Sequence, residues 1–480
     1  MRALVIIVLA LGCSGNSRTE EPDFGHDETT LEASDATGGT DAQKEPAVVH
    51  EDFRVVYGYR GRPVKPEFNG KNDLFLADAR DADPTNDISL TEKALKKVDP
   101  TLNCDLGCFV DPYLRWMVVV TETSPTDGTH TLKLGRFGAN LSLNMMKFEG
   151  LTQVKHLVFA GNYLFFSRPQ PDCVATEGPP ATCYQIWRLD LNNLADLKQL
   201  ATFPTPDSLA HSLFAGYFTA SDDGTTLLFM NPTNISQRVY LWRDGHMSRV
   251  GDPLCTAKDP SGIPGKCGST GTLSTYTEKD PVAISPDGKT VVFALVEGDE
   301  LRLYRHDLET DTRRFSVLLS VPSPYQANKC YNREPWQYTA VLPPLRFSRD
   351  GKDVIFLGYA ACGENQQKPW TNIVRIALDR IGTGQKLTAS DLKLVTDNPT
   401  GDIARCISIS YFDLSPSGQY ITFIGTPTIE SDGKTPIKDT DNRHRSDAEV
   451  YVTASDGSSL PVQITNSLYW SATTVQVVMP

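Results

Sequence analysis

The chain has 480 residues, 40% of them hydrophobic, and a formal net charge of −13. This charge disfavours nucleic acid and anionic membrane surfaces as partners, because both repel an acidic protein. Ten cysteines without a CxxC pair indicate disulfides in an oxidising compartment rather than a zinc site.

The first predicted element is a signal peptide at residues 1–12. Arg2 gives it a positive start, and the apolar run from Ala3 to Leu11 is too short for a bilayer span, which needs about 20 residues. Gly12 followed by Cys13 resembles the bacterial lipobox, in which the cysteine carries diacylglycerol. We therefore predict a lipoprotein anchored at Cys13. The alternative is an ordinary signal peptide with a chance cysteine.

The next predicted element, residues 13–52, is a disordered tether that starts with the lipidated cysteine. Residues 14–52 contain eleven Asp or Glu but only two basic residues, and almost no large apolar ones. Such a composition cannot bury enough surface to offset chain entropy. Ser14 after Cys13 resembles an outer-membrane sorting signal, so we expect a protein of the outer membrane that faces the periplasm or the cell surface.

Residues 53–480 are predicted to form a single β-propeller, because one pattern repeats along them. Four turns with a following apolar strand align: SDDGTTLLF from residue 221, SPDGKTVVF from 285, SRDGKDVIF from 348 and SPSGQYITF from 415. The glycine of each turn suits the positive φ that a tight hairpin requires. A strand that is apolar on both faces is typical of a middle strand in stacked blades.

A second repeat follows each turn, an alternating strand that ends in a charged turn. It recurs as RVYLWRDG from residue 238, LRLYRHDLET from 301, TNIVRIALD from 371 and EVYVTASDG from 449, with looser copies from 73, 131 and 184. Counting this strand predicts an all-β fold of seven four-stranded blades, A to D. Six blades with an extra edge ribbon is the alternative. We expect residues 469–480 to close the ring beside residues 54–59.

These repeats resemble those of the TolB family, which belong to the WD40-like, PD40-type propeller repeats and recur in prolyl-oligopeptidase propellers. The resemblance covers roughly residues 105–470. It implies an extracytoplasmic propeller that scaffolds envelope proteins. The acidic tether and the predicted lipid anchor depart from the TolB pattern, so the resemblance carries over the fold and not the Tol partnership.

The sequence contains no recognised catalytic or cofactor motif. A G-x-S-x-G nucleophile elbow and an HExxH motif are both absent, and the eight histidines are scattered. His306 is interpreted as an isolated surface histidine in a charged turn. His211 precedes the fourth blade and is a candidate for the central channel, although the sequence favours a hydrogen-bonded loop position for it. We predict no metal site and no cofactor.

All the long insertions are predicted to lie on one face of the ring, because they fall in B–C or D–A connections. The cysteines lie there too. We predict disulfides Cys173–Cys183, Cys255–Cys267 and Cys330–Cys362, and Cys104 could close a small loop with Cys108. The pairing of Cys104, Cys108, Cys330, Cys362 and Cys406 stays open, and Cys330–Cys362 is the pair we favour among the last three. Such disulfides either preorganise a binding surface or simply hold loops together in an exported protein.

One of these insertions, CYNREPWQY from residue 330, is rich in the residue types of binding hot spots: Tyr331, Arg333, Trp336 and Tyr338. Packing against a neighbouring loop is the alternative role for Trp336. By contrast, Trp187, Trp242 and Tyr304 lie on C strands, where packing between blades explains them.

The leading functional hypothesis is a monomeric, lipid-anchored scaffold that binds an envelope or extracellular protein and touches the membrane only through its lipid. A propeller lyase, lactonase or glycan-active hydrolase is the second hypothesis. A glycan or small-ligand receptor with its site at the channel mouth is the third.

Overall fold

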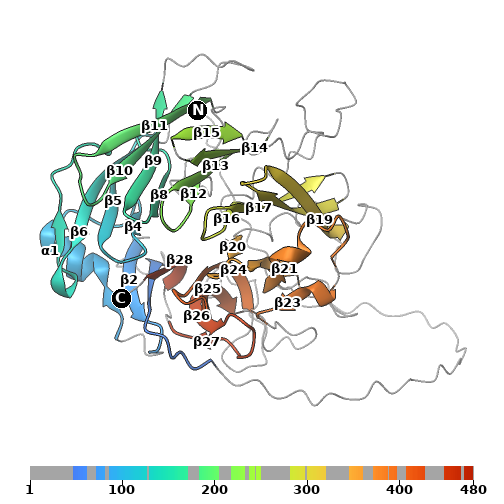
Figure 1. Ribbon diagram of the computed structural model, residues 1–480. Helices are drawn as coiled ribbons and strands as arrows, with labels where there is room; N and C mark the ends of the chain where they lie inside the picture. Colours follow the sequence, from blue (N-terminus) through green and yellow to red (C-terminus); the bar gives the residue numbers. More distant parts are fainter. Residues whose placement is uncertain are drawn as a thin grey trace, which may run out of the picture.

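The computed structural model describes residues 47–61, 72–81, 86–126, 129–170, 183–204, 218–232, 237–243, 245–249, 282–297, 300–320, 345–359, 371–387, 389–396, 407–427, 448–465 and 470–478. These residues form seven four-stranded antiparallel sheets. The sheets follow one another in chain order around a ring (Figure 1). This arrangement confirms the predicted seven-bladed β-propeller and excludes the six-bladed alternative.

The strands are given blade by blade, from A to D. The first blade consists of β28 (Trp470–Val478), β1 (Arg54–Gly61), β2 (Asn72–Asp78) and β3 (Ile88–Ser89), and the second of β4 (Cys108–Val110), β5 (Trp116–Thr123), β6 (His130–Phe137) and β7 (Leu143–Met145). The third blade consists of β8 (Leu157–Ala160), β9 (Tyr163–Gln170), β10 (Cys183–Asp190) and β11 (Leu197–Pro204). The fourth blade consists of β12 (Phe218–Ala220), β13 (Thr226–Pro232), β14 (Gln237–Arg243) and β15 (His246–Arg249).

Blades five to seven are β16 (Val282–Ile284), β17 (Thr290–Glu297), β18 (Glu300–Asp307), β19 (Thr312–Ser320); β20 (Arg346–Phe347), β21 (Asp353–Tyr359), β22 (Thr371–Ala377), β23 (Leu392–Leu394); and β24 (Ile407–Leu414), β25 (Tyr420–Pro427), β26 (Glu449–Ala454), β27 (Val462–Gln463). The helical segments of the described residues are short: η3 (Thr91–Leu95), α1 (Lys96–Val98), η4 (Ala139–Leu141), η9 (Leu378–Arg380) and η10 (Ala389–Asp391).

The ring closes as the sequence predicts. The C-terminal strand β28 pairs antiparallel with β1, with Arg54 opposite Val478 and Gly61 opposite Trp470. The innermost strand of the first blade therefore comes from the end of the chain, and its other three strands come from the beginning. The pairing gives β1 a hydrogen-bonded neighbour on each side, β28 and β2, so β1 is not an edge strand.

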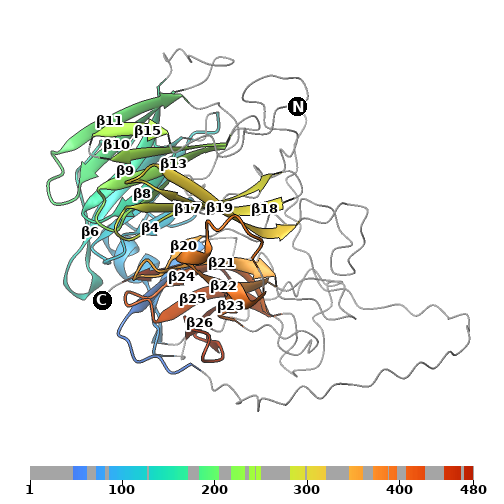
Figure 2. The same ribbon diagram turned by 45° about the vertical axis from the view of Figure 1, so that its right-hand side comes forward.

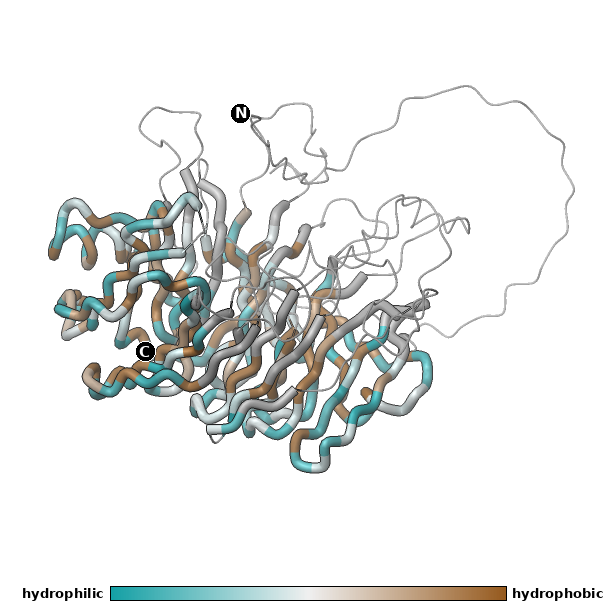
Figure 3. Tube along the Cα trace, turned by 90° about the horizontal axis from the view of Figure 1, so that it is seen from above, coloured by the Kyte–Doolittle hydropathy of each residue, from teal (hydrophilic) through white to brown (hydrophobic). Residues whose placement is uncertain are grey.

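A separate apolar cluster fills each of the seven seams between neighbouring blades. The seam between the seventh and first blades, for example, buries Phe53 and Tyr57 against Val450 and Val452. Figure 2 shows neighbouring sheets stacked in this way, and Figure 3 shows hydrophobic residues recurring along the strands. Burying such a side chain contributes roughly 1.5–3 kcal/mol, so the seams hold the ring together.

Candidate functional site

The strand order gives the propeller two different faces. The turn face carries the A–B and C–D turns, and the insertion face carries the B–C and D–A connections. The five long segments 171–182, 250–281, 321–344, 360–370 and 428–447 each join a B strand to a C strand or a D strand to the next A strand. Both ends of each segment therefore meet the ring at the insertion face, as predicted. The segments themselves lie outside the described residues.

The repeated A–B turns of the turn face share one hydrogen-bond pattern. In the fifth blade, Ser285 Oγ donates to Asp287 Oδ1 (2.5 Å) and accepts from Thr290 N (2.9 Å), while Gly288 N donates to Ser285 O (2.8 Å). The fourth and sixth blades repeat these bonds with Ser221 and Ser348. The serine therefore satisfies the buried backbone at the start of each B strand.

The turn of the second blade satisfies the corresponding backbone groups with different residues. Asp111 is fully buried, and its carboxylate accepts hydrogen bonds from the backbone N–H groups of Arg115 and Trp116. Leu114 has φ of 51°, in the place where the other turns have glycine. The repeat is thus hidden in the sequence because an aspartate replaces the serine and a leucine replaces the glycine.

Neighbouring turns also touch one another around the turn face. Arg115 of the second blade donates to Gly161 O (2.8 Å) and Asn162 Oδ1 (2.7 Å) of the third. A Cβ on Gly161 would lie 2.8 Å from the carbonyl oxygen of Asp223 in the fourth blade, so this position has no room for a side chain. Arg349 of the sixth blade pairs with Asp222 of the fourth (3.1 Å), past the turn of the fifth.

The seventh blade departs from the pattern, and the N-terminal segment completes it. Its turn has Ser417 where the turns of the fourth to sixth blades have aspartate. Glu51 replaces the missing carboxylate: Oε2 accepts from Ser415 Oγ (2.8 Å) and Ser417 Oγ (2.5 Å), and Oε1 accepts from Ser417 N (2.8 Å). The segment that carries Glu51 thus attaches the start of the chain to the last blade.

Further contacts hold this segment on the same face. Tyr420 Oη donates to Val48 O (3.1 Å) and accepts from His50 N (3.1 Å), and Ala47 N donates to Leu460 O (3.0 Å) in the C–D turn of the seventh blade. These contacts begin before residue 53, where the sequence predicted the propeller to start. At residue 47 the chain therefore lies on the turn face, opposite the insertions.

The insertion face has its own structural repeat, which the sequence analysis missed. A buried threonine follows the D strand and caps the C strand of the same blade: Thr91 Oγ1 accepts from Leu74 N (2.9 Å), Thr396 Oγ1 from Ile373 N (2.9 Å) and Thr465 Oγ1 from Val450 N (2.8 Å). A threonine in this position fixes the root of the D–A connection.

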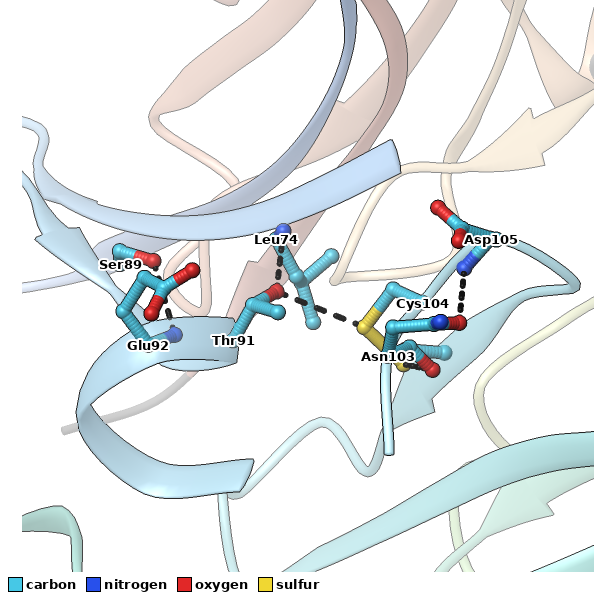
Figure 4. Close-up of a disulfide and its surroundings, with 8 residues drawn as sticks. Leu74, Ser89, Thr91, Glu92, Asn103, Cys104 and Asp105 are labelled. Atoms are coloured by element: carbon cyan, nitrogen blue, oxygen red, sulfur yellow. Dashed lines mark hydrogen bonds between the residues drawn. A yellow bond between two sulfur atoms is a disulfide. The ribbon is translucent and has the colours of Figure 1, made fainter. Parts of the chain in front are cut away.

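A disulfide lies beside the first of these threonines. The structure joins Cys104 to Cys108, which closes the small loop that the sequence left open. Thr91 Oγ1 lies 3.5 Å from Cys104 Sγ (Figure 4). The D–A connection into the second blade is thereby tied to β2 and to β4. On the same connection, Val98 and Leu106 expose large apolar side chains to solvent.

Basic side chains gather at the insertion end of the seam between the second and third blades. Arg168 lies near the end of β9, with its guanidinium carbon 5.0 Å from the ring centroid of Phe166 and 5.1 Å from that of Trp187. Lys155 and His130 lie nearby and are buried. Burial lowers the pKa of Arg168.

Two other histidines are buried. His156 shares a hydrogen bond with Ser167 Oγ (2.8 Å), and burial lowers its pKa to about 3, with the nearby Lys155 adding to the effect. His306 lies within β18 and is only 4% exposed, which corrects the interpretation of an isolated surface histidine in a turn. Burial lowers its pKa against the opposing effect of Asp311, which lies 3.0 Å from Nε2.

The residues that the sequence singled out for binding lie outside the described part of the chain. These are His211, Tyr331, Arg333, Trp336 and Tyr338. The same holds for Cys13 and for at least one member of each predicted disulfide; only the backbone of Cys183 is described, at the start of β10. Trp187, Trp242 and Tyr304 lie on C strands and pack in seams between blades, as predicted.

Two features of the described residues concern location and chemistry. No helix there is long and apolar enough to cross a membrane. Within the same residues, no group of three or more His, Cys, Asp or Glu side chains is arranged to hold a metal ion.

Comparison with known proteins returns similar structures but no related sequence. No family model matches the chain, and no curated protein does. A putative TolB from Agrobacterium tumefaciens is 13% identical, with a TM-score of 0.36 over 68% of this chain and 90% of that one. TolB from Acinetobacter baumannii is 10% identical, with a TM-score of 0.37 over 88% of this chain and 82% of that one.

A putative 6-phosphogluconolactonase from Bacteroides uniformis is also similar in structure. It is 12% identical, with a TM-score of 0.42 over 89% of this chain and 99% of that one. We assign the seven-bladed propeller from the strand pairing of the chain itself.

Proposed function

We propose that this protein is a lipid-anchored propeller outside the cytoplasm that binds another envelope or extracellular protein through its insertion face. In this proposal Cys13 carries the lipid in the outer membrane, residues 13–46 form the tether, and the ring works as a monomer.

The observation that carries the proposal is the position of residues 47–53. They lie on the turn face, held by Glu51 and Tyr420. A tether that continues from residue 47 starts on the side of the ring opposite the insertions. Lipid attachment at Cys13 therefore leaves the insertion face free for a partner, whereas a tether on the insertion face would compete with it.

The chemistry of the insertion face supports protein binding. The Cys104–Cys108 disulfide and the capping threonines hold its connections in place, so less conformational entropy is lost when a partner docks. Exposed Val98 and Leu106 add apolar surface. We include the segment 330–338 in the proposed contact surface because Tyr, Trp and Arg tend to dominate binding energies.

Two experiments test this proposal. Cys13→Ser should move the protein from the membrane fraction to the soluble fraction; unchanged membrane association would rule out the lipid anchor. Crosslinking and pull-down from membranes should recover a discrete partner. Trp336→Ala should weaken that capture, whereas Lys352→Ala on the turn face should not. An unchanged partner set with Trp336→Ala would remove the segment 330–338 from the proposal.

A further inference from the structure

Arg168 differs from the arginines of the ring that pair with a carboxylate. Arg375 pairs with Asp353, Arg349 with Asp222 and Arg115 with Asp111. Arg168 has no such partner in the described residues: its Nε is buried without a hydrogen bond. The burial that lowers its pKa is not opposed by any carboxylate.

Two aromatic rings hold this guanidinium in place. Phe166 and Trp187 lie opposite each other on β9 and β10, and the guanidinium carbon is about equally distant from both. Trp187 is itself fixed by a hydrogen bond from Nε1 to Gln185 Oε1 (3.2 Å). An arginine held in this way loses little side-chain entropy when its hydrogen bonds are finally made.

The segment that precedes β8 pairs with β9 next to Arg168. Lys155 N donates to Ser167 O (2.9 Å) and Ser167 N donates to His156 O (3.0 Å), so the β8–β9 ladder continues beyond β8. Both bonds involve Ser167, so Lys155 and His156 share one position opposite Ser167, the residue before Arg168. His130 of the second blade starts β6 at the same level, bonded to Val154 on both backbone groups.

We propose that Arg168, held between Phe166 and Trp187, is the anchor that takes a carboxylate from an acidic segment of the partner protein. This inference rests on the proposed function and names the partner's chemistry. The planar guanidinium matches a carboxylate through two parallel hydrogen bonds. Because the whole protein carries a net charge of −13, a local basic group also determines where an acidic partner docks.

The direct test uses the purified full chain and a fluorescein-labelled hexaglutamate peptide in a fluorescence anisotropy titration at low salt. Arg168→Gln should weaken binding at least tenfold. Arg168→Lys should weaken peptide binding less, because lysine keeps the positive charge but lacks the planar guanidinium that makes two parallel hydrogen bonds. Unfolding curves should show that all variants are folded.

Arg188→Gln is the matched control. Arg188 lies on β10 of the same blade, toward the turn face, and its guanidinium carbon is 4.4 Å from the ring centroid of Tyr163. The affinity of the Arg188→Gln variant for the hexaglutamate peptide should stay within twofold of that of the unsubstituted protein. Equal binding by Arg168→Gln and Arg188→Gln would overturn the inference. So would binding of inorganic phosphate through Arg168 without any binding of the peptide.

Capture of the partner from membranes separates this inference from the proposed function. If the partner is captured equally by Arg168→Gln and Arg188→Gln, the anchor is wrong and the scaffold proposal stands. If hexaglutamate binding depends on Arg168 but the unsubstituted protein captures no envelope protein, the scaffold proposal fails and a carboxylate site remains. Loss of capture with Arg168→Gln alone supports both.

Discussion

Glu51→Ala should detach the N-terminal segment from the turn face without unfolding the ring. The substitution removes the acceptor of three hydrogen bonds, two from hydroxyl groups and one from a backbone N–H. Hydrogen bonds to a charged group contribute about 1.5–3 kcal/mol each when buried. At this partly exposed site we expect a combined loss of about 1–2 kcal/mol.

Amide hydrogen exchange of residues 47–53 measures this loss locally. A free-energy change of about 1–2 kcal/mol raises the opening equilibrium roughly 5- to 30-fold. The amides of Ala47 and His50, which donate to Leu460 O and Tyr420 Oη, should exchange faster by this factor. Amides of β17, which the whole sixth blade separates from the seventh, should not change. Unchanged exchange at Ala47 and His50 would refute the role assigned to Glu51.

A second variant makes the test specific. Ser417→Asp restores the aspartate that the other SxDG turns have, so the turn no longer needs Glu51. In the Ser417→Asp background, removing Glu51 should therefore cost much less than in the natural sequence. The two substitutions form a double-mutant cycle, and additive effects would contradict the proposed contact.

Three further predictions test the ring and its titratable groups. Gly161→Ala should destabilise the protein by roughly 1–3 kcal/mol more than Gly245→Ala in urea unfolding, because both have positive φ but only Gly161 has a carbonyl oxygen in the way; equal losses would contradict the contact between turns. His156 binds a proton in the unfolded chain below pH 6.5 but in the folded chain only near pH 3, so stability is lost as pH falls through this window, by about 3 kcal/mol at pH 4.5. His156→Asn should reduce the dependence of the unfolding free energy on pH, and an unchanged dependence would contradict the role assigned to His156. Mass spectrometry of non-reduced peptides should join Cys173 to Cys183; finding both as free thiols would refute that disulfide.

The fold could be predicted because one sequence pattern repeats along the chain. A serine, a glycine and an apolar strand recur at intervals of about 65 residues, and each turn folds with local hydrogen bonds. Closure was predictable for a similar reason, since both chain ends carry β-rich segments that need a partner. The wrong interpretation of His306 came from counting a strand position as part of the turn that follows it.

The functional features of the surface were less accessible. The role of Glu51 depends on a contact across more than 360 residues, although the serine at position 417 in a turn that elsewhere has aspartate was a visible signal. In the sequence Arg168 looks like an ordinary charged residue, because one of its two aromatic neighbours, Trp187, comes from another strand. Spacing along the chain carries no information about such a site, which the pairing of β9 with β10 assembles.

Site-specific photocrosslinking in intact membranes tests the central claim, that partners bind at the insertion face. A benzoyl-phenylalanine at Leu106 reports on the insertion face, and one at Lys352 reports on the turn face; both side chains are exposed. The account predicts a discrete protein adduct from position 106 and none from position 352. The same adduct from position 352, with none from position 106, would contradict it.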